Sequence, residues 1–347
     1  MKKYIIGACG NFDLDPLFLN GQIIRTCSIM DQLEKEIGKE RIRRLSYASW
    51  KKHPIKTILK YYSLFAHCEN VILFPDLRAI FVLIPLACLF KKITKSKVYY
   101  NVIGGWLPEF LGEHVFIRRC TKSLDGLFVQ TNQLAEQLRI IGITRTTVFP
   151  NFKDIKIYSI EEKPEAYTKP LSLVFMSRIT GRKGVKELVS TINKINTEKI
   201  KYTLDIYGSV QDDFKEDFDQ LKDSFGKAIT YKGQVDPLKT SSVMKDYFLH
   251  IFPTTFKTEG YPGSVLDALA AGVPTLSARW LSYNDVLDEG KTGMSFTLGN
   301  WQEMEETLEN IYDNPEKVWK MREDCISEAE KYRPEKIIKI IIDKLQL

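Results

Sequence analysis

Residues 253–274 read PTTFKTEGYPGSVLDALAAGVP, and this stretch decides how the fold is interpreted. It follows a candidate strand at 250–252 and predicts a loop and then a helix that starts at Gly263 and Ser264 and ends at Gly272. The amides of a helix start point outward, at the positive end of the helix dipole. The stretch therefore predicts a strand–loop–helix unit with polar groups gathered at its loop.

Two carboxylates accompany the predicted helix. Glu259 lies in the loop before it, and Asp267 lies within it. At this spacing the two side chains can accept hydrogen bonds from hydroxyl groups at two places on one ligand. Taken singly, each has a plainer interpretation, Glu259 as a loop carboxylate and Asp267 as an ordinary acid early in a helix.

A second loop of the same kind lies upstream. Residues 176–184 read MSRITGRKG, between a predicted strand at 171–176 and a predicted helix at 186–195. Basic side chains beside glycines at such a junction can bind a phosphate together with helix amides. Arg178 and Lys183 are the candidates, and a basic surface loop is the alternative.

Short β-branched or aromatic runs alternate with amphipathic stretches along the whole chain. The predicted strands are 4–8, 70–74, 98–102, 126–129, 147–149, 171–176, 202–207, 230–232, 250–252 and 275–277. Such alternation favours βαβ units and parallel sheets, whose ligands collect at the carboxyl ends of the strands. We expect an α/β protein with a ligand in the cleft between two lobes.

The length of 347 residues favours two domains. Residues 1–152 form the expected N-terminal domain, and 153–169 are polar and charged enough to be a linker. Residues 170–326 form the expected C-terminal domain, which contains both loops. The segment 327–347 carries an isoleucine-rich helix, which we expect to dock back on the N-terminal domain.

These motifs together resemble the retaining glycosyltransferases of family 4, whose fold is the two-Rossmann form called GT-B. That family carries two Glu residues separated by seven others, in a stretch like EGFPxxxxEAxAxGxPV. The matching positions here are Glu259, Gly260, Pro262, Ala268, Ala270, Gly272 and Pro274, with Tyr261 as a close substitute. The Arg and Lys of the family's R-x4-KG stretch fall on Arg178 and Lys183.

The resemblance implies two Rossmann-like domains facing across a cleft, an acceptor-side domain at 1–152 and a nucleotide-sugar-binding domain at 170–326. It also implies a role for each matched residue. Arg178 and Lys183 would hold and neutralise the departing diphosphate, and Glu259 would face the donor sugar, so these three are the expected catalytic residues. The expected donor-binding residues are Gly21, Val235, Gly260, Tyr261, Pro262, Gly263, Ser264 and Asp267. Asp267 would hold the ribose hydroxyls, and backbone near Val235 would meet the base.

The sequence departs from the family pattern at two places. The second acid is Asp267 and not Glu, and its reach is shorter by one methylene. The N-terminal histidine that many members place against the sugar has no counterpart near the matching strand. His114 is the nearest histidine, and a surface or core role is expected for it.

Two N-terminal segments also resemble family motifs. Residues 20–26 (NGQIIRT) are similar to the first glycine loop, which includes Gly21. Residues 104–109 (GGWLPE) resemble a motif of transferases that build bacterial surface polysaccharides, which implies an acceptor-side role for Gly105, Trp106 and Glu109. A packed turn is the alternative for these residues singly. Asp13-Leu14-Asp15 spells a metal-binding DxD, but its place beside Pro16 favours a turn, and no metal is expected.

Charge is unevenly distributed along the chain. Residues 1–152 carry a net charge of +10 and the remainder −4, giving +6 overall. A basic N-terminal half suits an anionic partner such as a phospholipid surface or a lipid-linked phosphate. No pattern typical of nucleic-acid binding is present. The longest apolar run, 79–90, is too short to span a membrane, so we expect a cytoplasmic protein with peripheral contact to the inner face of the membrane.

The expected activity is transfer of a sugar from a nucleotide diphosphate, with UDP-sugar favoured, to an acceptor hydroxyl, with retention of anomeric configuration. The acceptor is expected to be a glycan or a lipid-linked molecule of bacterial cell-surface polysaccharide synthesis. No cofactor is expected, since the nucleotide-sugar is a substrate. The alternatives are a GT-B-fold epimerase or phosphorylase, or an inactive sugar-nucleotide-binding subunit.

Overall fold

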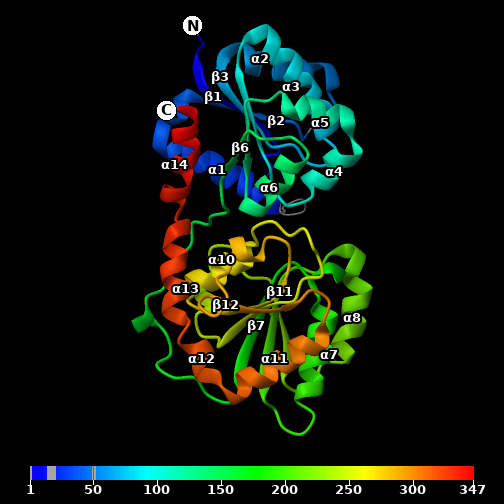
Figure 1. Ribbon diagram of the computed structural model, residues 1–347, viewed down its shortest axis with the longest axis vertical. Coiled ribbons are helices and arrows are strands. Elements are labelled where there is room, and N and C mark those ends of the chain that lie inside the picture. The colour runs from blue at the N-terminus through cyan, green and yellow to red at the C-terminus, as the bar shows by residue number, and fades with distance from the viewer. Residues whose placement is uncertain (1, 14–20, 49, 51) are drawn as a thin grey trace. The chain divides into compact units, whose positions relative to one another are not determined.

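The computed structural model describes residues 2–13, 21–48, 50 and 52–347. The chain divides into two compact units (Figure 1). Unit 1 comprises Met1–Asn151 and Pro334–Leu347, and unit 2 comprises Phe152–Arg333. The segment 153–169, expected to be a linker, groups with unit 2, and the chain returns to unit 1 at Pro334 rather than at 327.

Unit 1 is built on a six-stranded sheet in the order β2-β1-β3-β4-β5-β6, with every neighbouring pair parallel. Its strands are β1 (Tyr4–Gly10), β2 (Ile42–Ser46), β3 (Cys68–Leu73), β4 (Lys97–Asn101), β5 (Gly126–Val129) and β6 (Thr146–Val148). The carboxyl ends of β1, β2 and β3 therefore lie at one edge of this sheet.

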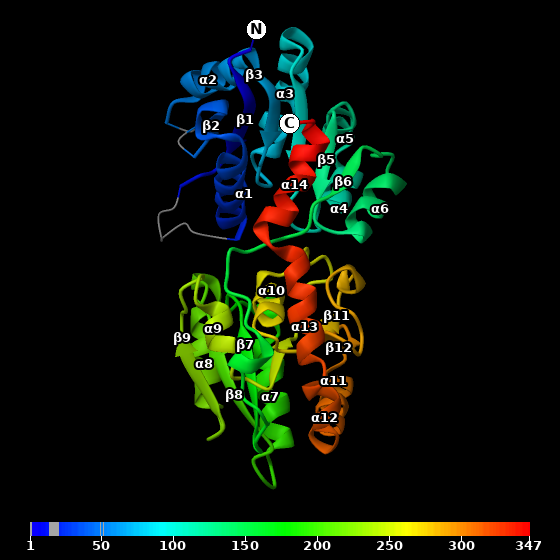
Figure 2. The same ribbon diagram turned by 90° about the vertical axis from the view of Figure 1, so that its left-hand side faces the viewer.

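Helices cover both faces of the unit 1 sheet. They are α1 (Gly21–Ile37), α2 (Pro54–His67), α3 (Ile80–Thr94), α4 (Leu107–Glu113), α5 (Val115–Lys122), α6 (Asn132–Ile140) and α14 (Pro334–Leu345). Helix α2 packs on α3 and α3 on α5, whereas α14 lies alongside α1 (Figures 1 and 2). The buried isoleucines of α14, Ile337, Ile338 and Ile341, explain why this helix docks rather than staying exposed.

Unit 2 repeats the plan with the order β12-β11-β10-β7-β8-β9, again parallel. Its strands are β7 (Leu171–Met176), β8 (Tyr202–Tyr207), β9 (Ile229–Gly233), β10 (Leu249–Phe252), β11 (Thr275–Arg279) and β12 (Gly293–Thr297). Its helices are α7 (Val185–Ile195), α8 (Lys215–Asp223), α9 (Thr240–Met244), α10 (Gly263–Ala270), α11 (Trp301–Asp313), α12 (Pro315–Trp319) and α13 (Arg322–Ala329). Helix α10 packs against α9 and α13, and α11 packs against α7.

The α/β fold class with parallel sheets is confirmed, and two strands were missed by the sequence analysis. Each predicted strand corresponds to an observed one within about two residues, but β2 and β12 were not predicted. Both are edge strands of mixed polarity, IRRLS and GMSFT, with only partial burial. Edge strands tolerate polar side chains because one side faces solvent, so they lack the apolar run used for prediction.

Candidate functional site

The two loops singled out from the sequence emerge at the same edge of the unit 2 sheet. Strand β10 pairs with β7 in parallel, with Leu249 opposite Leu173 and His250 opposite Val174. The loop after Met176 and the loop after Phe252 therefore leave the sheet side by side. This edge holds the strand ends where parallel sheets bind ligands.

Lys183 and Glu259 are in direct contact at this edge. The Lys183 Nζ donates to Glu259 Oε1 as an ion pair, and both side chains are largely buried, with 19% and 13% of their surface exposed. The Lys183 ammonium also lies 5.1 Å from the centroid of the Phe252 ring. The buried Thr254 hydroxyl donates to the same Oε1 over 3.1 Å. Glu259 is thus an oriented carboxylate with a cation beside it.

A glycine allows the two loops to meet. Gly184 has a φ of +69°, and a Cβ there would overlap the carbonyl oxygen of Pro253. The Thr255 amide donates to the Arg182 carbonyl over 2.9 Å, which joins the loops next to this close approach. Glycine adopts the left-handed backbone readily and has no Cβ to overlap the Pro253 carbonyl, so it suits this position as no other residue does. The pairing of Lys183 with Glu259 depends on this contact between backbones.

Arg178 lies on the same loop but is not brought into contact with the pair. Its side chain is exposed, and among the described residues it makes no hydrogen bond or ion pair. The backbone next to Arg178 is held in place, because the amide of the following residue, Ile179, donates to the Ser209 carbonyl over 2.8 Å. Arg178 is therefore an exposed cation at this edge of the unit 2 sheet that is available to bind a ligand.

The start of α10 follows the Glu259 loop. Gly263 and Ser264 are partly exposed in its first turn, as the sequence predicts, and Pro262 is the buried N-cap residue. Gly260 precedes them in the partly exposed loop. Tyr261 points into the protein, with its ring 5.2 Å from that of Tyr332. Any donor contact of Tyr261 would therefore come from its backbone.

Asp267 is enclosed by protein groups. Only 3% of it is exposed, and its Oδ1 accepts from the Lys153 Nζ at 2.5 Å and the Thr240 hydroxyl at 2.7 Å. Burial raises the pKa of Asp267, and Lys153 and Thr240 oppose that rise. The ribose role implied for Asp267 stays a prediction, and this oxygen already has two donors.

Three residues of the site were not found from the sequence. Lys153 and Thr240 hold Asp267, and Thr254 holds Glu259. Lys153 falls in the segment expected to be a linker, and it is separated from Asp267 by 114 positions. No local pattern links residues so far apart. Val235, predicted beside the base, follows β9 and packs partly buried against the cluster that contains Met176 and Met244.

In unit 1 the predicted acceptor-side residues lie around the start of α4. The Trp106 indole nitrogen donates to the Ile103 carbonyl over 3.1 Å, and the ring packs 5.5 Å from Phe110. Gly105 is partly exposed and Glu109 is exposed. His114 is stacked on the Phe110 ring at 4.2 Å, which agrees with a packing role. Gly21 is the exposed first residue of α1.

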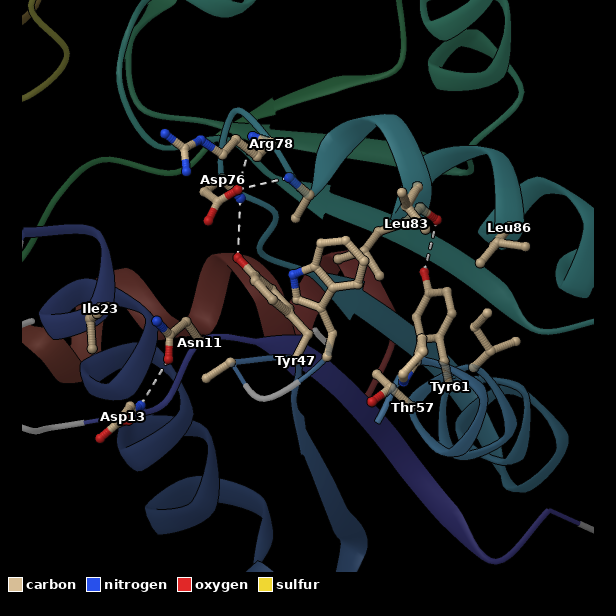
Figure 3. A pocket seen from close by; sticks show the side chains of 16 residues that line it. Asn11, Asp13, Ile23, Tyr47, Thr57, Tyr61, Asp76, Arg78, Leu83 and Leu86 are labelled. Carbon is tan, nitrogen blue, oxygen red and sulfur yellow. Dashed lines mark hydrogen bonds between the residues drawn. The ribbon is translucent and has the colours of Figure 1, made fainter. Parts of the chain in front are cut away.

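A cavity of about 560 Å³ opens in unit 1 at the carboxyl ends of β1, β2 and β3 (Figure 3). Its lining is largely apolar, and seven of the 16 lining residues come from α2 and α3. Two acids, Asp13 and Asp76, line it, and Oδ1 of Asp76 accepts from the Arg78 and Ala79 amides at 2.9 and 2.7 Å. The Tyr61 hydroxyl likewise donates to the Leu83 carbonyl over 3.0 Å. Arg78 is the cation among the described residues that line this cavity.

From the sequence we expect neither a metal site nor a membrane-spanning helix. The Asp13 amide donates to the Asn11 side-chain oxygen over 3.0 Å, as in a turn, whereas Leu14, Asp15, Pro16 and Asn20 lie outside the described residues. Within residues 2–13, 21–48, 50 and 52–347, no group of three or more His, Cys, Asp or Glu is arranged to hold a metal. In the same part of the chain, no helix has the length and hydropathy to cross a bilayer.

Two doubly wound parallel sheets in series define the GT-B class of α/β proteins, and solved structures agree. The structure of Anabaena HepE in complex with UDP matches with a TM-score of 0.77 at 12% identity, over 99% of both chains. Residues 157–332, half of the chain, match the family described as Glycosyl transferases group 1. The chain belongs to this family.

Two relatives resemble part of the chain in sequence. The sulfoquinovosyl transferase SQD2 of Arabidopsis thaliana is 27% identical over 205 residues, which are 57% of this chain and 38% of that enzyme. The lipopolysaccharide 1,6-galactosyltransferase of Salmonella typhimurium is 23% identical over 220 residues, 62% of this chain and 60% of that enzyme. The similarity thus spans less than two thirds of either relative.

Proposed function

We propose that this chain is a retaining glycosyltransferase of family 4 that moves a sugar from a nucleotide diphosphate, with UDP favoured, to an acceptor hydroxyl. The observation that carries the proposal is the Lys183–Glu259 pair at the carboxyl edge of the unit 2 sheet. Membership of the Glycosyl transferases group 1 family supports it, as does the likeness to a solved UDP complex.

The charges at this edge suit the departure of a diphosphate. An ammonium group has three N–H donors, so Lys183 keeps donors for phosphate oxygens while Glu259 accepts one. The exposed Arg178 adds a guanidinium fork that can bind phosphate in a bidentate manner. Lys183, which Glu259 holds in place before the reaction, can stabilise the developing negative charge with little reorganisation. Glu259 would then face the donor sugar, and no metal takes part.

We place the acceptor in bacterial cell-surface polysaccharide synthesis, as a glycan or a lipid-linked molecule. The similarity to the Salmonella lipopolysaccharide galactosyltransferase supports this choice. Gly105, Trp106 and Glu109 are the proposed acceptor-side residues. The basic unit 1 suits a protein that is peripheral to the inner face of the membrane, and nucleic acid is not a proposed partner.

Turnover of two variants tests the proposal. Arg178→Ala and Lys183→Ala should each lower kcat by roughly 10²- to 10³-fold, because each removes a group that stabilises charge. Lys194→Ala, at an exposed lysine of α7 paired with Glu305, is the matched control and should leave kcat unchanged. Wild-type turnover by both site variants at saturating UDP-sugar would refute their role.

Product analysis tests the finer claims. The new linkage should keep the anomeric configuration of the donor, as measured by NMR, and a chelator should leave the rate unchanged. Nucleotide release that needs no acceptor would favour an epimerase, and formation of a sugar phosphate from a glycan and inorganic phosphate would favour a phosphorylase. Donor binding without turnover across a broad acceptor panel would favour an inactive sugar-nucleotide-binding subunit.

A further inference from the structure

Helix α2 has two apolar faces. Tyr61, Leu64 and Phe65 are buried against the rest of unit 1. Ile55, Ile58, Leu59 and Tyr62 point the other way and are 74%, 41%, 63% and 39% exposed. The exposed set has the spacing i, i+3, i+4 and i+7, which places its members on one side of a helix. A surface helix of a globular protein needs only one apolar face, so the second calls for a partner.

Helix α3 continues this exposed apolar surface. Val82, Leu89 and Ile93 are 44%, 52% and 59% exposed and lie on its outer side. The two helices pack together, with the Tyr62 and Phe90 rings 5.2 Å apart. Ile58 of α2 and Val82 of α3 both line the cavity of Figure 3. The cavity therefore opens within a single surface, which we call the α2–α3 face: Ile55, Ile58, Leu59, Tyr62, Val82, Leu89 and Ile93.

Positive charge is concentrated around the α2–α3 face. Residues 52–97 hold eight Lys or Arg against two Asp or Glu, an excess equal to the net charge of +6 of the entire chain. Lys56, Lys60 and Lys92 are exposed on the same two helices. Of the two acids, Asp76 is engaged by backbone amides. Asp13 also lines the cavity and Lys91 pairs with Asp125, but helices α2 and α3 themselves carry four lysines and no Asp or Glu.

We propose that the α2–α3 face docks on an anionic lipid bilayer. Exposed isoleucine, leucine and tyrosine side chains beside lysines are the composition of helices that lie in the bilayer interface. Clustered lysines are attracted to anionic headgroups, and exposed apolar side chains enter the region between headgroups and acyl chains. The face presents both, over two adjacent helices, and its apolar cavity has room for part of a lipid chain.

This inference rests on the peripheral membrane contact of the proposed function, but its test needs neither donor nor acceptor. Sedimentation should be measured with vesicles of phosphatidylcholine alone and of phosphatidylcholine mixed with phosphatidylglycerol. The protein should bind the anionic vesicles at least about tenfold more tightly. Raised salt should weaken the binding, because salt screens the lysines.

Two paired variants separate the contributions of the face. Ile55→Glu with Leu59→Glu should abolish binding to anionic vesicles, and Lys56→Glu with Lys60→Glu should remove the preference for them. All four side chains are exposed, so the melting temperature should stay unchanged. The control is Ile140→Glu with Leu238→Glu, at positions 73% and 69% exposed but outside the face, and it should bind as wild type.

Several outcomes would overturn the inference. Wild-type protein that stays in the supernatant with both kinds of vesicle would do so, as would Ile55→Glu with Leu59→Glu binding normally. Self-association that these variants abolish, without vesicle binding, would assign the face to a second copy of the chain. UDP binding, followed by calorimetry in the same variants, reports on unit 2 and should be retained. Loss of the proposed transferase activity and loss of vesicle binding are therefore distinguishable.

Discussion

Glu259 illustrates how much of the site is fixed at the scale of single residues. Its carboxylate is held by the Lys183 ammonium and the Thr254 hydroxyl, and Thr254 is fully buried. The Thr254 hydroxyl also accepts from the Phe256 amide over 3.1 Å, which orients it toward Glu259. Thr254 acts through Glu259 and is a positioning residue.

Thr254→Val removes this hydroxyl while keeping the shape of the side chain. We expect kcat for the proposed transfer to fall roughly tenfold, the equivalent of about 1.5 kcal/mol, since the lost hydrogen bond goes to a charged group. Thr254→Ser keeps the hydroxyl and should restore most of kcat. Equal losses in both variants would point to packing rather than to orientation of Glu259.

The residues of the site divide into those that sequence could reveal and those that it could not. Arg178, Lys183 and Glu259 were predicted because each lies in a local strand–loop–helix stretch that resembles a family motif. Lys153 was not, since its partner Asp267 is 114 positions away. Such contacts form only in the tertiary fold, so a local sequence pattern cannot predict them.

At the scale of elements, the site depends on two loops that follow neighbouring strands. Strands β7 and β10 were predicted because both are buried apolar runs. The order of the strands was not predictable, because periodicity along the chain does not say which strands pair. Only the pairing of β7 with β10 brings Lys183 to Glu259.

Gly184→Ala tests this contact between elements. The substitution combines a left-handed backbone with overlap against the Pro253 carbonyl, so unfolding free energy should fall by roughly 1–3 kcal/mol. Nucleotide binding should weaken as well, because the loop that carries Lys183 must move away. Both quantities can be measured, by denaturant titration and by calorimetry.

The matched control is Gly181→Ala in the same loop. A Cβ at Gly181 would lie 3.5 Å from the Phe214 ring, which is ordinary contact, and φ there is not in the left-handed region. Stability should therefore change little. Similar losses in the two variants would mean that the loop as a whole, and not the approach of Gly184 to Pro253, governs the site.

At the scale of the whole molecule, the buried side chain of Lys163 lowers the free energy of unfolding while it is charged. Burial, with Arg322 nearby, lowers the pKa of Lys163 to about 7, and its Nζ has no hydrogen-bond partner among the described residues. The folded pKa lies below the unfolded one, so unfolding takes up a proton between about pH 7 and 10.5. The folded chain therefore becomes more stable as pH rises from about 7 to 10.5. Below about pH 7, Lys163 is charged in the folded chain, and the full free-energy cost of burying that charge is present.

Lys163→Met keeps the length of the side chain without its charge. We expect the melting temperature of unit 2 to rise, most strongly at or below about pH 7, with the gain shrinking as pH approaches the unfolded pKa. Melting curves across this range, followed by circular dichroism, would measure it. Lys239→Met, at an exposed lysine, should show no such trend. A gain that is the same at every pH would contradict the burial of a charge.

The discontinuity of unit 1 has a consequence for biosynthesis. Unit 2 is one continuous segment, whereas unit 1 needs α14, which leaves the ribosome only after all of unit 2. Until then, the surface of α1 that α14 later covers has no partner within unit 1. A nascent chain can therefore fold unit 2, which is synthesised second, before unit 1 is complete. Until α14 is synthesised, the amino-terminal part of unit 1 exposes the apolar surface of α1, to which chaperones can bind.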